Sequence, residues 1–207
     1  MGRSAAASAT QLAAAAPPGL CLDFANTRYW RGTKQPTETL GAPGDLLGWF
    51  KASSGVDAST LGVLRAEWRR SPQAGRTDFA AAIDLREAIF RIFAASSGGG
   101  VPIAGDLDRL NAALAQAPQR RRLGRGKHRF AWEVGGAPLA RMLAPVLWSA
   151  GDLLAGPGIA RLRQCANPAC QWLFLDDSKS GTRRWCAMSA CGNRAKAHRH
   201  YLKRKKG

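Results

Sequence analysis

The chain has 207 residues, with 31 Lys and Arg against 14 Asp and Glu and a formal net charge of +17. That length suits one domain, or one domain with a small added module. The charge favours a polyanionic partner, and no apolar stretch approaches the roughly 20 residues of a membrane span, which argues against a membrane protein.

The chain begins with an Ala-rich stretch, residues 1–18, which we interpret as a disordered tail because it lacks the Leu- or Val-rich core of a secretory signal. Without a signal, the expected compartment is the cytoplasm, where thiols stay reduced. The next block, residues 19–30, could be a short strand or the start of a helix. Its polar residues Asp23, Asn26 and Thr27 fit either the ligand pocket of a sensor domain or a capping and turn network.

Apolar residues at helical spacing predict a series of helices. Asp45 is the expected N-cap of the first, and Thr77 is the expected N-cap of the longest, which three glycines end. The predicted helical segments are 45–53, 58–71, 77–100, 105–118 and 137–156. Pro145 should kink or split the last of them.

A short β-hairpin is predicted between the last two helices. Phe130, Trp132 and Val134 alternate with other residues, as in a strand, and the sequence GRGK at 124–127 suits a turn. A basic cluster in this region is either an auxiliary binding surface or an exposed loop; it comprises Arg120, Arg121, Arg122, Arg125, Lys127 and Arg129. The Gly-Pro-Gly at 156–158 is the expected domain boundary, which separates a helical domain (19–156) from a C-terminal domain (160–207).

Four of the five cysteines lie in the C-terminal domain, at Cys165, Cys170, Cys186 and Cys191. Two C-x4-C pairs with fifteen residues between them follow the plan of a four-thiolate site that holds one structural zinc ion. Buried free thiols, disulfides and a catalytic thiol are the alternatives, and His198 or His200 could replace a cysteine ligand. The remaining cysteine, Cys21, stands in an apolar block and is expected to be buried.

Few large apolar residues accompany this cysteine cluster, so a metal would have to hold the C-terminal domain together. Structural zinc can contribute on the order of 10 kcal/mol to folding. We therefore expect metal removal to unfold residues 160–207 and to leave the helical part folded.

The positive charge is concentrated in the same domain. Residues 161–207 hold twelve Lys or Arg and two acidic residues, a net of +10. A rigid metal-held knob followed by a basic helix suits contacts with phosphates and groove edges of a nucleic acid. The candidate contact residues are Arg183, Arg184, Trp185, Asn193, Arg194, Lys196, Arg199, Lys203 and Arg204.

Three motifs in this region resemble the CGNR zinc-finger family, named for the tetrapeptide that stands here at 191–194. They are FLD at 174–176, RRWC at 183–186 and CGNRAK at 191–196. The preceding region is similar to the ABATE domain, in particular at LDFANT, residues 22–27. The resemblance implies a bacterial stress-related transcription regulator whose finger binds DNA.

The expected fold is therefore mainly α: a multihelical domain with a short hairpin, then a small four-cysteine finger of knuckles and a basic helix. The expected function is zinc-dependent DNA binding in transcription regulation, with the helical domain as a sensor of an unknown small molecule or as a homodimerisation unit. The alternative is an RNA- or ribosome-associated zinc module. No catalytic set of residues is evident, so an enzyme is not expected.

Overall fold

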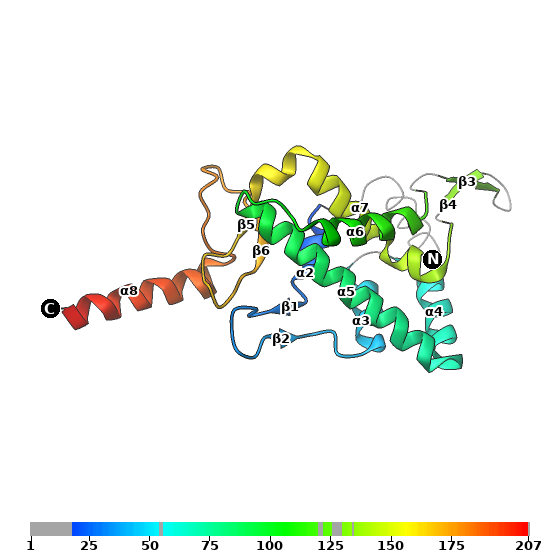
Figure 1. Ribbon diagram of the computed structural model, residues 1–207, viewed down its shortest axis with the longest axis horizontal. Helices are drawn as coiled ribbons and strands as arrows, with labels where there is room; N and C mark the ends of the chain where they lie inside the picture. Colours follow the sequence, from blue (N-terminus) through cyan, green and yellow to red (C-terminus); the bar gives the residue numbers. More distant parts are fainter. Residues whose placement is uncertain (1–17, 54–55, 120–121, 126–129, 134, 207) are drawn as a thin grey trace, which may run out of the picture.

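The fold is mainly α-helical, and the structure, a computed structural model, describes residues 18–53, 56–119, 122–125, 130–133 and 135–206 (Figure 1). The elements in chain order are α2 (Leu20–Ala25), β1 (Arg28–Tyr29), β2 (Thr37–Glu38), α3 (Pro43–Ser53), α4 (Ala58–Arg70), α5 (Pro72–Ser97), α6 (Ala104–Gln116), β3 (Arg122–Arg125), β4 (Phe130–Glu133), α7 (Pro138–Ala155), η1 (Pro157–Arg161), β5 (Leu162–Gln164), β6 (Leu173–Leu175), η2 (Met188–Gly192) and α8 (Asn193–Lys206). The predicted tail, apart from Pro18, lies outside the described residues. Among the described helices, none has the length and apolarity needed to cross a membrane.

The predicted helices are all present, but two of their starting points were wrong. The longest helix, α5, begins at Pro72 rather than near Thr77, because Ser71 accepts a hydrogen bond from the Ala74 N–H and proline suits the first helical position. Asp45 lies inside α3 instead of capping it. Its carboxylate accepts hydrogen bonds from the backbone N–H groups of the two residues just before the helix, at 3.0 Å each.

The block at 19–30 starts as a helix. In α2 the apolar side chains point in several directions and are all buried, as expected for a helix enclosed by others. Cys21 is fully buried within it, as predicted, and burial raises the pKa of its thiol to about 12. Pro145 does not split α7, which is continuous around it.

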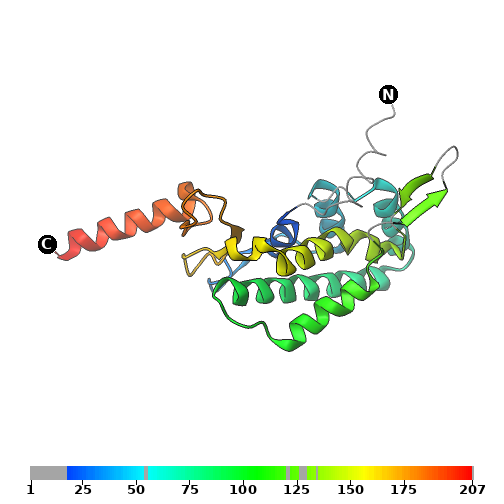
Figure 2. The ribbon, with the colours of Figure 1, turned by 90° about the horizontal axis from the view of Figure 1, so that it is seen from above.

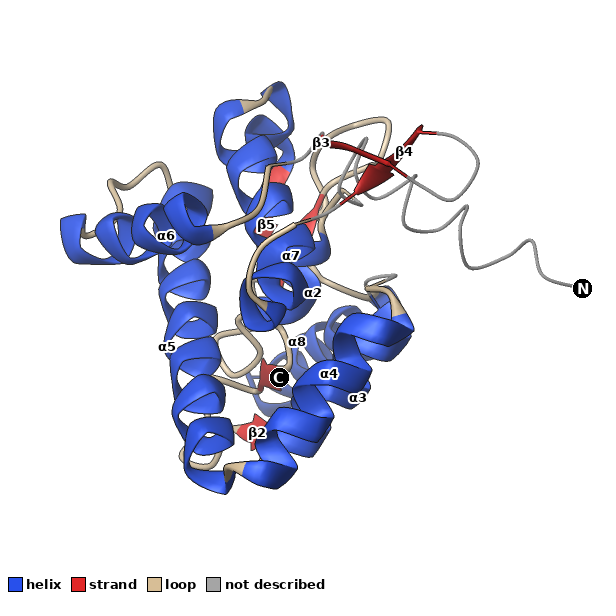
Figure 3. Ribbon diagram, turned by 90° about the vertical axis from the view of Figure 1, so that its right-hand side faces the viewer, coloured by secondary structure: helices blue, strands red, loops and turns tan. Residues whose placement is uncertain are grey.

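The main hydrophobic core lies where α2 contacts α5 and α7. Helix α4 packs against α5 and α7, and α3 packs against α5 and α4. Seen along the molecule, α2 and α7 lie between α5 and α4 (Figure 3). Phe24, Phe50 and Phe93 are completely buried here. Phe50 and Phe93 lie in segments that the sequence predicted to be helical from their apolar spacing, whereas the block that holds Phe24 was left open between strand and helix.

Two appendages leave this body in opposite directions. The predicted hairpin is present as β3 paired antiparallel with β4, with Leu123 opposite Trp132; its expected turn and Val134 lie outside the described residues. It projects from one end of the molecule, while α8 extends from the other (Figure 2). Arg122 and Arg125, on β3, are therefore far from α8; the other four residues of that basic cluster lie outside the described residues.

The hydrophobic core crosses the boundary expected at 156–158. The hairpin β5–β6 pairs Leu162 with Leu175, and Leu162 and Leu173 belong to the same buried cluster as the helices. Alternation along β6 turns Phe174 to the other face, where it packs with the cysteines. This hairpin thus joins the helical body to the cysteine cluster.

Candidate metal centre

The first cysteine pair is presented by the loop of the β5–β6 hairpin. Its bend is organised by Asn167, whose carbonyl accepts the N–H groups of Cys170 at 2.9 Å and Gln171 at 3.3 Å. Gln171 has a φ of 57°, a left-handed conformation that turns the chain into β6. The Cys165 N–H donates to the carbonyl of Trp172 at 2.8 Å and closes the loop. Both thiols therefore face the same side.

The second pair is carried by the approach to α8. Cys186 precedes the single wide turn η2, and Cys191 lies within it. The Gly192 N–H donates to the Ala187 carbonyl at 3.1 Å across this turn, a spacing of five residues. A Cβ on Gly192 would lie 2.6 Å from the sulfur of Met188, whose exposed side chain would have to move aside.

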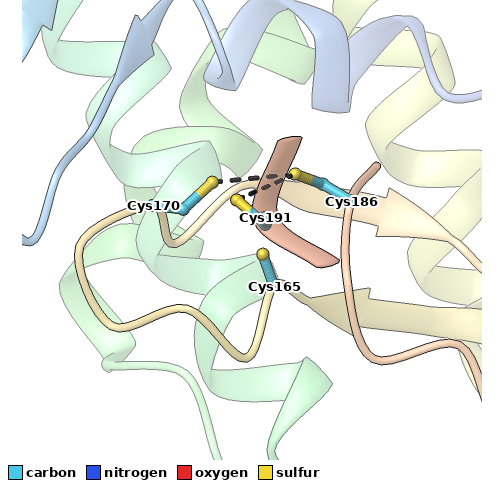
Figure 4. Close-up of side chains that lie close together, drawn as sticks. All are labelled: Cys165, Cys170, Cys186 and Cys191. Atoms are coloured by element: carbon cyan, nitrogen blue, oxygen red, sulfur yellow. Dashed lines mark hydrogen bonds between the residues drawn. The ribbon is translucent and has the colours of Figure 1, made fainter. Parts of the chain in front are cut away.

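The four thiols converge on one point (Figure 4). All four sulfurs lie within 4.8 Å of one another; the Cys170–Cys186 distance is 3.7 Å and the Cys186–Cys191 distance is 3.8 Å. Sulfurs at about 2.3 Å from a tetrahedral Zn²⁺ are separated by about 3.8 Å. None of the four is in a disulfide. The predicted zinc ligands are thus brought together, with two of the sulfur pairs at the spacing of a tetrahedral zinc site.

The electrostatics of the cluster also favour a cation. Burial and the neighbouring sulfur of Cys165 raise the pKa of Cys186 to about 11, and burial raises the pKa of Cys170 as well. Four adjacent thiols cannot all ionise unless a positive charge neutralises them, and Zn²⁺ supplies that charge. Asn167 Nδ2 lies 3.5 Å from the sulfur of Cys191, where an N–H donor stabilises a thiolate. The donor set therefore fits one structural zinc.

One wall of the metal centre comes from the helical body. Trp30, after β1, packs against the cysteine cluster, and the guanidinium of Arg194 lies over its ring at 4.5 Å. The Gly32 N–H donates to the carbonyl of Ala169 at 3.2 Å. A Cβ on Gly32 would lie 1.8 Å from the carbonyl oxygen of Pro168, so only glycine fits there. The segment around Trp30 and Gly32 thus packs closely against the loop of the first cysteine pair, Cys165 and Cys170, which we call the first knuckle; the loop of Cys186 and Cys191 is the second.

An ion-pair network holds this segment in place. Arg86, 1% exposed, binds both carboxylate oxygens of Glu38 at 2.6 Å, and Arg31 binds Glu87 at 2.7 Å and 3.0 Å. Burial alone would raise the pKa of Glu87, but the Arg31 hydrogen bond and the surrounding guanidinium charges hold it below its usual value. Both glutamates therefore stay ionised, and α5 anchors the loop that touches the metal centre.

Comparison with known families agrees with this architecture. Residues 19–157 match the ABATE family, described as "Putative stress-induced transcription regulator". The chain belongs to the ABATE family. Residues 161–204 match the CGNR zinc finger, so the resemblance seen in the sequence is confirmed. No curated protein matches the chain.

The ABATE motif at LDFANT has a structural use. The side-chain amide of Asn26 donates to the Leu173 carbonyl at 2.8 Å and accepts its N–H at 3.1 Å, which fastens α2 to β6. Thr27 donates to the Phe24 carbonyl at 2.7 Å and accepts from Arg86 at 3.2 Å. Asp23 is exposed. Asn26 and Thr27 thus form the turn network given as the alternative role, and a ligand pocket at these residues stays a prediction.

The predicted nucleic-acid residues fall into two groups around the CGNR finger. Arg183 donates to the carbonyls of Trp185 and Cys186, and its guanidinium lies over the Phe174 ring at 4.6 Å, so it supports the second knuckle. Arg184 lies over the Trp185 ring at 5.5 Å. The remaining residues lie on α8; Asn193, Arg194, Lys196 and Arg204 are exposed, while the side chains of Arg199 and Lys203, like those of His198 and His200, lie outside the described part.

Sequence reasoning missed three residues that shape the finger. Trp30 and Gly32 act across the chain, and no local pattern marks them. Asp176 was visible in the FLD motif but received no role. It is buried, and its carboxylate accepts the N–H groups of Ser178 at 3.0 Å and Arg183 at 2.8 Å. It thereby closes the loop that returns the chain to the second cysteine pair.

Proposed function

We propose that this zinc-finger protein is a DNA-binding transcription regulator in which the zinc centre directs α8 toward the major groove. The observation that carries the proposal is α8 itself. Between Asn193 and Lys206 the sequence has seven Lys or Arg and no acidic residue, and the helix extends away from the body (Figure 1). Such a helix repels itself unless anionic groups surround it.

The dimensions of α8 support a groove contact. Its 14 residues give a length of about 21 Å, and a helix with side chains is about as wide as the major groove of B-DNA, roughly 12 Å. Beyond its first turn, the described side chains of Ala197, Tyr201, Arg204 and Lys205 are all exposed, so they are not buried against the body. The first turn is fixed by Cys191 and by the contact of Arg194 with Trp30, so the direction of the helix is set at its start.

Binding rather than catalysis fits the chemistry of the metal site. Four thiolates complete the coordination of Zn²⁺, whereas catalytic zinc keeps one position for water or substrate. We therefore propose that the protein is not an enzyme. We also propose that it acts in the cytoplasm and that the ABATE domain serves sensing or dimerisation.

The test is anisotropy titration of a labelled duplex at several salt concentrations. Contacts with about five phosphates predict a log–log salt slope near −4 to −5. The double variant Lys196→Ala/Arg204→Ala should lower the affinity at least tenfold and reduce the slope by about 2. The matched control, Arg69→Ala/Arg70→Ala, removes the same charge from exposed positions on α4 and should leave both values unchanged. Equal losses in the two variants would refute α8 as the contact.

Structured RNA and single-stranded DNA are titrated at the same salt. Tighter binding to RNA than to duplex DNA would favour the RNA-associated alternative. Selection of bound genomic fragments, with Cys186→Ser/Cys191→Ser as the comparison, then tests whether the metal-held finger recognises a DNA sequence. Equal enrichment of the same fragments by both proteins would show that it does not.

A further inference from the structure

A cavity of about 570 Å³ lies in the ABATE domain, away from the metal centre, where α4, α5, α6 and α7 meet. Its floor consists of Leu64, Leu85, Leu143 and Leu147. The space exists because small side chains line it where longer ones would fill it: Ala81, Ala112, Ala113, Ala137 and Ala140. The volume is within the range of roughly 300–1,000 Å³ typical of small-molecule sites.

The charged groups of this cavity oppose the charge of the whole protein. Among the described residues that line it, three carboxylates, those of Glu67, Asp78 and Asp84, face one guanidinium, that of Arg109. Arg109 pairs with Asp84 at 3.5 Å, and both of these side chains are more than half exposed. The carboxylates of Glu67 and Asp78 are left without a positive partner among the described residues. In a chain of net charge +17, this is a local negative site.

The two carboxylates are also partly removed from water. Glu67 and Asp78 are half-buried, and Asp78 accepts a hydrogen bond from the indole N–H of Trp68 at 2.8 Å. An indole is a neutral donor, so it orients the carboxylate without cancelling its charge. A partly desolvated carboxylate attracts a cation more strongly than one in bulk water does.

We propose that this cavity binds a small organic cation with an apolar body, its ammonium group at Glu67 and Asp78 and its hydrocarbon part over the leucine floor. An anion of the same shape would face two carboxylates, and a neutral molecule would leave them unpaired. The proposal concerns binding to the ABATE domain and does not depend on DNA binding by α8.

The test uses three probes that share one hydrocarbon body: 4-phenylbutylamine, 4-phenylbutanol and 4-phenylbutyrate, each titrated calorimetrically into the zinc-loaded full chain. The amine should bind at least tenfold more tightly than the alcohol, and the butyrate should bind more weakly than either. A preference of less than tenfold for the amine would overturn the proposal.

Two variants locate the site. Glu67→Gln should reduce amine binding at least fivefold, whereas the matched control Asp108→Asn, which removes an exposed acid outside the cavity lining, should leave it unchanged. Ala112→Trp fills the cavity from an exposed position and should abolish binding, with an unchanged circular dichroism spectrum as the check on folding. Unaltered amine binding in both Glu67→Gln and Ala112→Trp would place the site elsewhere and refute the inference.

Discussion

At the scale of single residues, the contact between the ABATE domain and the finger depends on positions with little tolerance. Gly32 is one of them, because its Cα faces the backbone of Pro168 rather than a side chain that could move aside. Backbone atoms of the first knuckle cannot shift without displacing Cys165 and Cys170. Stability and metal affinity are therefore linked at this glycine.

We expect Gly32→Ala to destabilise the zinc-loaded protein by about 1–3 kcal/mol, the usual cost of overpacking, and to weaken zinc binding. Chemical denaturation and competition with a chromophoric chelator measure the two effects. Gly48→Ala is the control: a Cβ there meets nothing within 4 Å, and within a helix the change should stabilise by about 0.5–1 kcal/mol. Similar behaviour of the two variants would show that the close approach at Gly32 has no energetic consequence.

Asn26 is the second such position. Its amide occupies both hydrogen-bonding groups of Leu173, and both residues are almost fully buried. Asn26→Ala should cost about 1–3 kcal/mol for each backbone group left unpaired, measured by denaturation. Asn26→Asp should be no better, since a carboxylate oxygen would face the Leu173 carbonyl. Asn111→Ala, at an exposed site on α6, should have little effect on the free energy of unfolding. A comparable loss of stability in this control would mean that the hydrogen bonds to Leu173 do not explain the effect at Asn26.

At the scale of elements, the sequence predicted the existence of helices better than their ends. The periodic apolar residues of α5 begin at Phe79, so the pattern missed its first turns, although Ser71 and Pro72 carry an ordinary helix-start signal. The zinc ligands were predictable because two short pairs of cysteines form a local pattern. The contacts of Asn26 and Gly32 were not, because they join residues more than 130 positions apart and leave no periodicity in the sequence.

The start of α4 gives a prediction at this scale. Asp57 accepts from the N–H of Thr60 at 2.8 Å and from its hydroxyl at 2.6 Å, and it pairs with Arg141 at 3.1 Å. Burial alone would raise the pKa of Asp57, but the hydrogen bonds from Ser59 and Thr60 and the charge of Arg141 lower it. We expect Asp57→Ala to cost about 1–2 kcal/mol at pH 7, as for other lost caps.

The pH dependence of this difference has a definite sign. Because the pKa of Asp57 is lower in the folded state than its usual value of 3.8, its contribution is fully present above pH 3.8 and is lost as pH falls through the folded value. The gap in unfolding free energy between wild type and Asp57→Ala should therefore be constant from pH 7 to about pH 5 and should shrink below pH 4. A gap that widened on acidification would contradict the ionised cap.

At the scale of the whole molecule, the finger and the ABATE domain share a hydrophobic core. The inward face of β5–β6 is buried against α2 and α5, while its outward residue Phe174 packs with the cysteines. Sequence reasoning treated residues 160–207 as a separate unit with few large apolar residues of its own, and it did not foresee a core shared with the helices. The energetic consequence is that the hairpin is stabilised by the shared core in addition to the metal centre, whereas the cysteine-bearing loops are not part of that core.

Because of this shared core, we expect metal removal to unfold only part of residues 160–207 rather than all of them. The segments that depend most on zinc are the two knuckles and the start of α8, which contact the helical body at Trp30 and Gly32, whereas β5–β6 keeps its leucine contacts and the Asn26 hydrogen bonds. Hydrogen exchange after chelation should therefore show lost protection at about 165–172 and 183–197 and retained protection in α5 and β6. Adding zinc back should restore the pattern.

Cys191→Ser should show the same loss without chelator, while Cys21→Ala, outside the cluster, should respond to chelator as wild type does. Loss of protection throughout the chain would mean that the metal stabilises the entire core as one cooperative unit, and no change at all would mean that the cysteine cluster holds its shape without a metal.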